Sequence, residues 1–123
     1  METFQSMKLP QWAVEHLASN GITRPTPIQM QGIPVALTGR DMIGVAFTGS
    51  GKTLTFLVPA IFAAVAEELR MPIRGCEGPV CLVVCPSREL ARQTFEVLNG
   101  FANALETATV DYKEIVSKHT RER

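Results

Sequence analysis

Apolar residues recur with helical spacing over residues 54–69 of this chain. Six apolar positions in residues 54–69 fall on one face of a helix, namely Leu54, Leu57, Val58, Ile61, Val65 and Leu69. Pro59 lies inside this stretch, so we expect a kink there. A further helix is expected from about Ser87 to Leu105, with the Ser87 side chain as its N-cap.

Two shorter helices are expected in the first third of the chain. The segment 10–20 begins with Pro10, which suits a first helical position, and ends at Asn20-Gly21, a helix stop signal. A second helix is expected to start near Pro27, after a proline-rich extended turn. Pro34 is expected to break or restart that helix.

Two continuous apolar runs, residues 41–46 and 80–85, predict buried strands. Each run is followed by a predicted helix, and residues 71–79 between the two units predict a surface loop rich in proline and glycine. Strand, helix, strand and helix in this order predict an α/β fold, with parallel strands flanked by helices. Because two strands are too few for a buried parallel sheet, we expect the sheet to be incomplete.

Composition limits the classes of protein that this chain can represent. With 123 residues, 46% hydrophobic and 20% charged, the sequence predicts one small folded domain. The 12 basic residues balance the 12 acidic ones, so total charge predicts no binding to polyanions. No apolar run reaches the roughly 18 residues that span a bilayer, so we expect a soluble intracellular protein without membrane contact.

The cysteines at positions 76, 81 and 85 lack the spacing of a zinc site. Cys81 and Cys85 share one predicted strand, where they lie too far apart for a disulfide. We therefore expect buried, reduced, structural cysteines.

The segment Ala-Phe-Thr-Gly-Ser-Gly-Lys-Thr at residues 46–53 has the chemistry of a phosphate-binding loop. Gly49 and Gly51 permit a tight turn whose N–H groups point at a phosphate, and the following helix adds its partial positive charge. Lys52 can reach the β- and γ-phosphates, and the Thr53 hydroxyl can bind Mg²⁺. Ala46 departs from the general motif, which has glycine there. The alternative interpretation is a chance turn between a strand and a helix.

Three motifs in this order resemble those of a DEAD-box RNA helicase. Residues 21–29 resemble the Q motif of the family, and residues 46–53 match its own P-loop, which carries alanine first. Residues 86–93 resemble motif Ia, with serine at position 87 where most members have threonine. The resemblance covers about residues 4–105 and is nearest to the Abstrakt-like subgroup. It implies the N-terminal part of a RecA-like P-loop NTPase domain.

The resemblance implies ATP, Mg²⁺ and RNA as ligands, with particular roles for matching residues. Phe4 is expected to stack on adenine, and the amide of Gln29 to bind its N7 and amino edge. The ATP-binding set is Phe4, Gln29, Thr48, Gly49, Ser50, Gly51, Lys52 and Thr53, of which Thr53 binds Mg²⁺. Ser87 and Arg88 are expected to contact the RNA backbone without reading its sequence.

Each of these roles has a structural alternative. Gln29 could be an ordinary residue of a helix surface, and Phe4 could fill the core. Arg88 and Glu89 could form a capped, salt-bridged helix start.

Other parts of the family pattern are absent from residues 1–123. No apolar strand ends in the Asp-Glu-Ala-Asp motif, and the second RecA-like domain with its arginine finger is missing. By its family resemblance, the chain is expected to come from an ATP-dependent RNA helicase. Because these parts are missing, we expect no catalytic residues in this chain and no ATP hydrolysis from it alone. The alternatives are a truncated, non-catalytic module that binds a nucleotide or a partner, and another P-loop NTPase such as a kinase.

The chain is expected to divide into residues 1–105, which carry the motifs, and a disordered or irregular tail at 106–123. Protein partners are not indicated by any motif. The subgroup resemblance implies a nuclear location.

Overall fold

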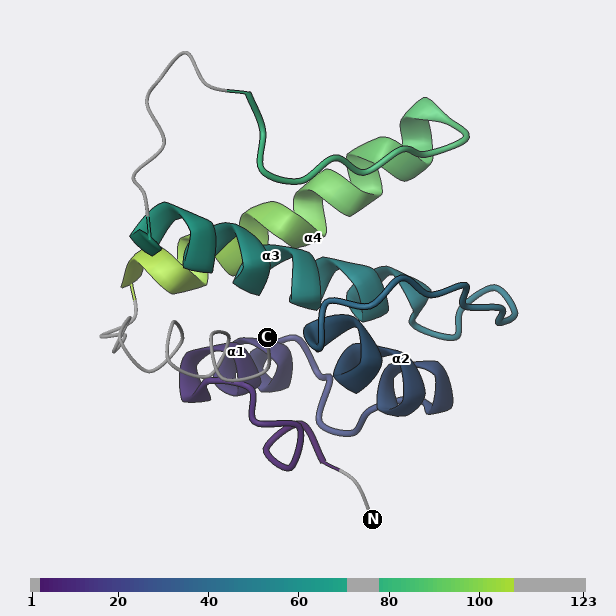
Figure 1. Cartoon of the computed structure of the whole chain (residues 1–123). Coiled ribbons are helices and arrows are strands. Elements are labelled where there is room, and N and C mark those ends of the chain that lie inside the picture. Colours follow the sequence, from purple (N-terminus) through teal and green to yellow (C-terminus); the bar gives the residue numbers. More distant parts are fainter. Residues whose placement is uncertain (1–2, 71–77, 108–123) are drawn as a thin grey trace.

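Four helices form the regular structure of the computed structural model, which describes residues 3–70 and 78–107 (Figure 1). These are α1 (Gln11–Ser19), α2 (Pro27–Leu37), α3 (Lys52–Arg70) and α4 (Arg88–Thr107). α2 packs along α3, α1 packs against α4, and α3 touches α4 more sparingly. All four helices were predicted from the sequence. None is long and apolar enough to cross a membrane, among the residues described.

Local signals account for the ends of three helices. Pro10 is the N-cap of α1, and the backbone N–H groups of Asn20 and Gly21 close its last turn. Pro27 is the first residue of α2, where its missing N–H costs nothing. The Ser87 Oγ accepts a 3.2 Å hydrogen bond from the Leu90 N–H, which confirms Ser87 as the cap of α4.

The prediction that Pro34 breaks or restarts a helix is wrong. α2 continues through Pro34 to Leu37 as one element. A proline inside a helix costs about 3 kcal/mol. Packing against α3 offsets this cost, since the neighbouring Ile33 is completely buried and belongs to the core.

The hydrophobic core joins the N-terminal segment to helices α1, α2, α3 and α4. The rings of Trp12 and Phe62 meet edge to face at 6.2 Å, which ties α1 to α3. The rings of His16 and Phe101 meet at 4.6 Å and tie α1 to α4. Among the described residues, the largest fully buried side chains are those of Phe4, Leu17, Ile33, Leu57, Gln29 and Val58.

The two predicted strands are not confirmed, because the described residues contain no strand. Yet the side chains of residues 81–85 alternate between the cavity side and the solvent side. Leu82 and Val84 are 81% and 85% exposed, whereas the Cys81 Sγ lies 3.5 Å from the Ala60 oxygen and Cys85 Sγ lies 3.9 Å from Thr94 Oγ1. This two-residue period is that of a strand. A strand also requires a hydrogen-bonded partner, and the described residues supply none for this segment.

The segment before the P-loop repeats this pattern. Ile43, Val45 and Phe47 are 95%, 88% and 80% exposed. A Cβ on Gly44, in contrast, would lie within van der Waals contact of Ile28 and Met42, on the side of α2. Each segment therefore packs one side against helices and exposes apolar side chains on its other side.

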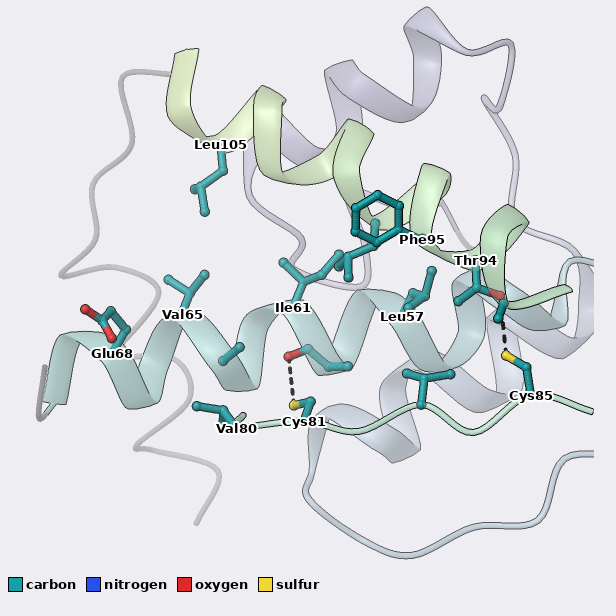
Figure 2. Close-up of a pocket in the computed structure, with 15 residues that line it drawn as sticks. Leu57, Ile61, Val65, Glu68, Val80, Cys81, Cys85, Thr94, Phe95 and Leu105 are labelled. Atoms are coloured by element: carbon teal, nitrogen blue, oxygen red, sulfur yellow. Dashed lines mark hydrogen bonds between the residues drawn. The ribbon is translucent and has the colours of Figure 1, made fainter. Parts of the chain in front are cut away.

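A cavity of about 760 Å³ lies between parts of α3 and α4, and the segment 80–85 forms its remaining wall. Figure 2 shows Leu57, Ile61 and Val65 of α3 pointing toward α4, with Cys81 and Cys85 on the segment beneath α3. The expectation of buried cysteines is wrong for Cys81, which is exposed, and Cys85 is half-buried. No second layer covers the far side of their segment in the described structure. Both thiols are free, as expected, and Cys76 lies outside the described residues.

α4 ends later than the sequence predicts. Glu106 and Thr107 belong to the last turn of α4, so the helix extends two residues beyond the expected limit of Leu105. Residues 108–123 lie outside the described part of the chain.

Candidate nucleotide-binding site

The loop before α3 has the backbone that the glycines predicted. Gly49 and Gly51 have φ values of +83° and +86°, in the left-handed region that other residues rarely adopt. Lys52 is the first residue of α3 and is exposed, and Thr53 beside it is half-buried. The loop thus delivers a cation and a hydroxyl to the N-terminus of a long helix, where an anion is stabilised.

Gln29 connects α2 to this loop. Its side chain is only 2% exposed, its Oε1 accepts a 3.0 Å hydrogen bond from the Thr26 N–H, and its Nε2 donates a 3.2 Å bond to the Gly51 oxygen. A buried amide with two specific contacts excludes the interpretation of Gln29 as an ordinary surface residue. The structure therefore brings together two of the three predicted motifs.

The Gln29 amide retains unused hydrogen-bonding capacity. A primary amide has two N–H donors and an oxygen with two lone pairs, and the protein contacts use one of each. One donor and one acceptor remain, which is the pair that the adenine N7 and amino edge requires. Because Gln29 is 2% exposed, a base can reach this amide only if surrounding side chains move.

Two buried hydroxyls beside Gln29 have no hydrogen-bond partner among the described residues. These are the Thr26 Oγ1 and the Ser50 Oγ. Thr26 is the N-cap residue of α2 and has the arrangement of a capping box with Gln29, although its hydroxyl makes no hydrogen bond of standard geometry. An unpaired buried hydroxyl is unfavourable, so both groups are suited to a polar ligand bound in the loop.

A magnesium site is only partly provided. Thr53 is the predicted ligand, and the described residues contain no cluster of three or more histidine, cysteine or acidic side chains. Thr48, predicted to bind ATP, is exposed on the loop. The residues present fit a phosphate chain better than they fit a bound cation.

Phe4 does not lie open at this site. It is 1% exposed and packs in the hydrophobic core with Met7, Leu9 and Trp12. A ring whose faces are covered by protein cannot stack on a base. The structure thus favours the alternative interpretation, in which Phe4 fills the core.

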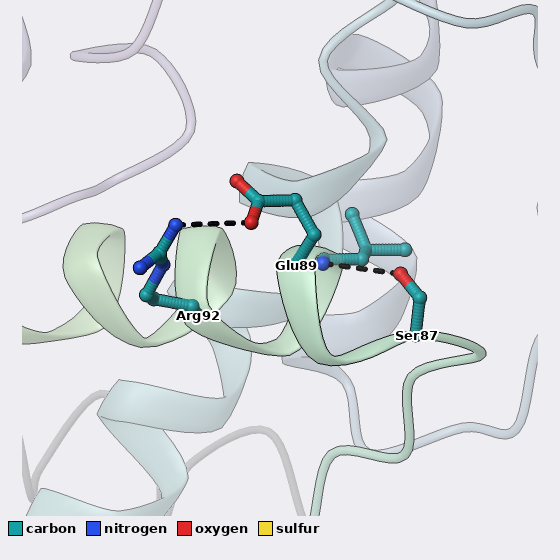
Figure 3. Close-up of polar contacts among 4 residues, drawn as sticks. Ser87, Glu89 and Arg92 are labelled. Carbon is teal, nitrogen blue, oxygen red and sulfur yellow. Dashed lines mark hydrogen bonds and ion pairs between the residues drawn. The ribbon is translucent and has the colours of Figure 1, made fainter.

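The predicted RNA-contacting segment forms the start of α4 (Figure 3). Ser87 caps the helix, and Arg92 Nη2 lies 3.0 Å from Glu89 Oε2 in an exposed ion pair. Arg88 is exposed and takes part in no ion pair within the described residues. The start of α4 is therefore capped and salt-bridged, but the arginine of the ion pair is Arg92 and not Arg88. The Arg88 guanidinium thus stays available for a phosphate.

Sequence reasoning missed Thr26, Gly32 and Thr55, although all three shape the site. The Thr55 Oγ1 donates a 3.3 Å hydrogen bond to the Gly51 oxygen. A Cβ on Gly32 would collide with the Thr55 methyl group, so this glycine lets α2 approach α3 closely. The available signals were a glycine inside a helix and a threonine directly before the proline that opens α2.

Comparison with known proteins gives a consistent family result. Residues 26–123 match the family described as DEAD/DEAH box helicase. The chain is 57% identical over 105 residues to DEAD-box ATP-dependent RNA helicase 35 of Arabidopsis thaliana, covering 85% of this chain and 18% of that protein. It is 49% identical over 106 residues to ATP-dependent RNA helicase abstrakt of Drosophila melanogaster, covering 86% and 17%. This chain thus spans less than a fifth of the length of these relatives.

A solved structure has a similar fold. The crystal structure of the RNA helicase Prp28 from Chaetomium thermophilum bound to ADP superposes with a TM-score of 0.73 at 37% identity. The match covers 85% of this chain and 25% of that one.

Proposed function

We propose that this chain, which belongs to the DEAD/DEAH box helicase family, is the nucleotide-holding part of an ATP-dependent RNA helicase. The observation that carries the proposal is the hydrogen bond from Gln29 Nε2 to the Gly51 oxygen. It joins the amide that would read the base to the loop that would bind the phosphates. A general P-loop protein has no need of this arrangement, so it favours a helicase over a kinase.

The phosphate chain of ATP would lie on the loop. The backbone N–H groups of Gly49, Ser50 and Gly51 and the ammonium group of Lys52 would hold its oxygens, with Thr48 at the loop entrance. Thr53 would bind the accompanying Mg²⁺. Bound ATP supplies the phosphoryl group whose hydrolysis drives remodelling of RNA in this reaction class.

The base would be read by Gln29. Its free donor and acceptor match adenine, whereas guanine presents two acceptors on the same edge. Stacking by Phe4 remains a prediction and requires its ring to leave the core.

RNA would be held at the start of α4. Ser87, Arg88 and the backbone N–H groups there suit phosphate oxygens, and such contacts carry no sequence information. Because residues 1–123 lack the Asp-Glu-Ala-Asp motif, this segment would hold ATP and RNA without hydrolysing ATP by itself.

We also propose that residues 41–46 and 80–85 are strands of a parallel RecA-like sheet when partner strands are present. The alternation of exposed and covered side chains supports this. The nuclear location remains a proposal that rests on the Abstrakt-like resemblance alone.

Nucleotide titration tests the proposed function. The chain should bind ATP more tightly than GTP, and Lys52→Ala should lose most ATP affinity because the charge at the phosphates is removed. Arg70→Ala is the matched control, since it removes a cation from the other end of α3. Equal ATP affinities for the wild type and Lys52→Ala would exclude the proposed site.

A further inference from the structure

The Gly51 carbonyl oxygen accepts two hydrogen bonds at once. One comes from the Gln29 Nε2 at 3.2 Å and the other from the Thr55 Oγ1 at 3.3 Å. Thr55 is 5% exposed and Gln29 is 2% exposed, so protein groups surround the carbonyl on both sides. A threonine hydroxyl bonded four residues back is common in helices. Here, however, the carbonyl has a second partner that lies 22 residues away in the sequence.

The direction of the Gln29 amide follows from its two protein partners. The Thr26 N–H is a donor and must face the amide oxygen, whereas the Gly51 oxygen is an acceptor and must face the amide nitrogen. A reversed amide would set oxygen against oxygen and nitrogen against nitrogen. The Gly51 carbonyl can select the direction of the amide only if the carbonyl itself is held in place.

Thr55 is also fixed from the side of α2. Its methyl group lies where a Cβ on Gly32 would collide with it, so it packs against bare backbone. This contact leaves the threonine little freedom to rotate and keeps its hydroxyl on the Gly51 oxygen. The methyl group therefore positions the side chain, and the hydroxyl positions the loop.

Resting on the nucleotide site proposed above, we propose that Thr55 is a positioning residue for base specificity. Its hydroxyl holds the Gly51 carbonyl, the carbonyl orients the Gln29 amide, and the amide separates adenine from guanine. Thr55 touches neither the base nor the phosphates in this scheme. It should therefore affect the choice of nucleotide more than the affinity for phosphate.

Thr55→Val tests the hydroxyl, because valine keeps the shape of threonine and removes the donor. We expect the ratio of ATP affinity to GTP affinity to fall by about 3- to 10-fold, the value of one hydrogen bond. Affinity for inorganic pyrophosphate should stay at the wild-type value. Thr55→Ser should keep more of the ATP preference than Thr55→Val does, since it keeps the hydroxyl and loses only the methyl group that packs on Gly32. Thr94→Val is the matched control, being a threonine of α4 that is 6% exposed and whose hydroxyl lies against Cys85 rather than against the Gly51 oxygen.

Gly32→Ala tests the packing contact. The added methyl group should displace Thr55 and lower the ATP preference as Thr55→Val does. Adding Thr55→Ser removes the methyl group that collides and keeps the hydroxyl, so the double variant should regain the wild-type preference. Isothermal titration with ATP, GTP and pyrophosphate provides the three affinities for each variant.

The outcomes separate this inference from the proposed function. A Thr55→Val protein with the same ATP-to-GTP ratio as Thr94→Val would overturn the role of Thr55. Equal losses for ATP, GTP and pyrophosphate would also overturn it, because they indicate a purely structural residue. If Lys52→Ala still lowers ATP affinity in either case, the nucleotide site itself stands. If Lys52→Ala has no effect, the proposed function fails instead.

Discussion

Gln29 shows how one buried side chain can serve structure and recognition together. Its amide oxygen accepts a hydrogen bond from the Thr26 N–H, and its amide nitrogen donates one to the Gly51 oxygen. These two bonds connect the start of α2 to the loop before α3. A leftover donor and acceptor can then read a base once the surrounding side chains have moved. The residue is therefore expected to matter for stability even without nucleotide.

Replacement of Gln29 should reveal both roles. Gln29→Ala removes two hydrogen bonds and leaves the Thr26 N–H unpaired, so we expect a loss of about 1–3 kcal/mol of unfolding free energy. The preference for ATP over GTP should disappear as well. Urea denaturation and nucleotide titration measure the two effects. Gln31→Ala, an exposed glutamine of the same helix, should change neither.

At the scale of elements, the start of α4 combines a cap with an exposed cation. The Ser87 hydroxyl satisfies one backbone N–H, and the Arg92–Glu89 pair occupies the first turn. Because both side chains of this pair are largely exposed, the pair itself adds little stability. Mutations of Ser87 and of Arg88 can therefore test the cap and the exposed cation separately.

Removal of the cap should weaken α4. Ser87→Ala is expected to lower the unfolding free energy by about 1 kcal/mol, whereas Ser87→Thr, the residue of most family members, should change it less. Thermal unfolding followed by circular dichroism compares the variants. An unchanged melting temperature in Ser87→Ala would contradict the capping role.

Arg88 should affect RNA binding through charge alone. In Arg88→Ala, the slope of log K against log salt should become shallower by about 1, and equally for RNAs of different sequence. Arg92→Ala serves as a control, because the Arg92 charge is already paired with Glu89. Binding that depends on RNA sequence would argue against backbone contacts.

At the scale of the whole molecule, the exposed apolar side chains of residues 42–47 and 80–85 favour association between copies of the chain. The two segments carry no charged residue, and the net charge of the chain is zero, so no repulsion opposes association of copies. We expect the isolated chain to self-associate unless these faces are made polar.

Charged substitutions on the bare face should improve solubility. Leu82→Lys with Val84→Lys should shift the chain toward monomer in light scattering, since both side chains are more than four-fifths exposed. Val83→Lys is the contrasting variant, because Val83 lines the cavity against α3 and α4 and a charge there should destabilise the fold. Equal behaviour of the two proteins would argue against a one-sided packing of the segment.

ATP turnover should be absent from the isolated chain, with or without RNA. The acidic motif and the arginine finger each lower the barrier substantially in this reaction class, and neither occurs in residues 1–123. Phosphate release is the measurement. Turnover that Lys52→Ala abolishes would contradict this expectation.

The sequence by itself determined the local features of this protein. The four helices, the left-handed glycines at 49 and 51 and the Ser87 cap follow from neighbours within a few residues, and all were predicted. Motif resemblance also identified the family correctly, because the motifs are short continuous stretches.

The tertiary structure decided the features that depend on distant partners. Packing on α3 carries α2 through Pro34, the core buries Phe4, and the Gln29 amide reaches a carbonyl 22 residues away. The strand prediction was not confirmed for the same reason. Alternation of apolar side chains favours an extended segment, but the segment becomes a strand only when a neighbouring segment supplies backbone hydrogen bonds.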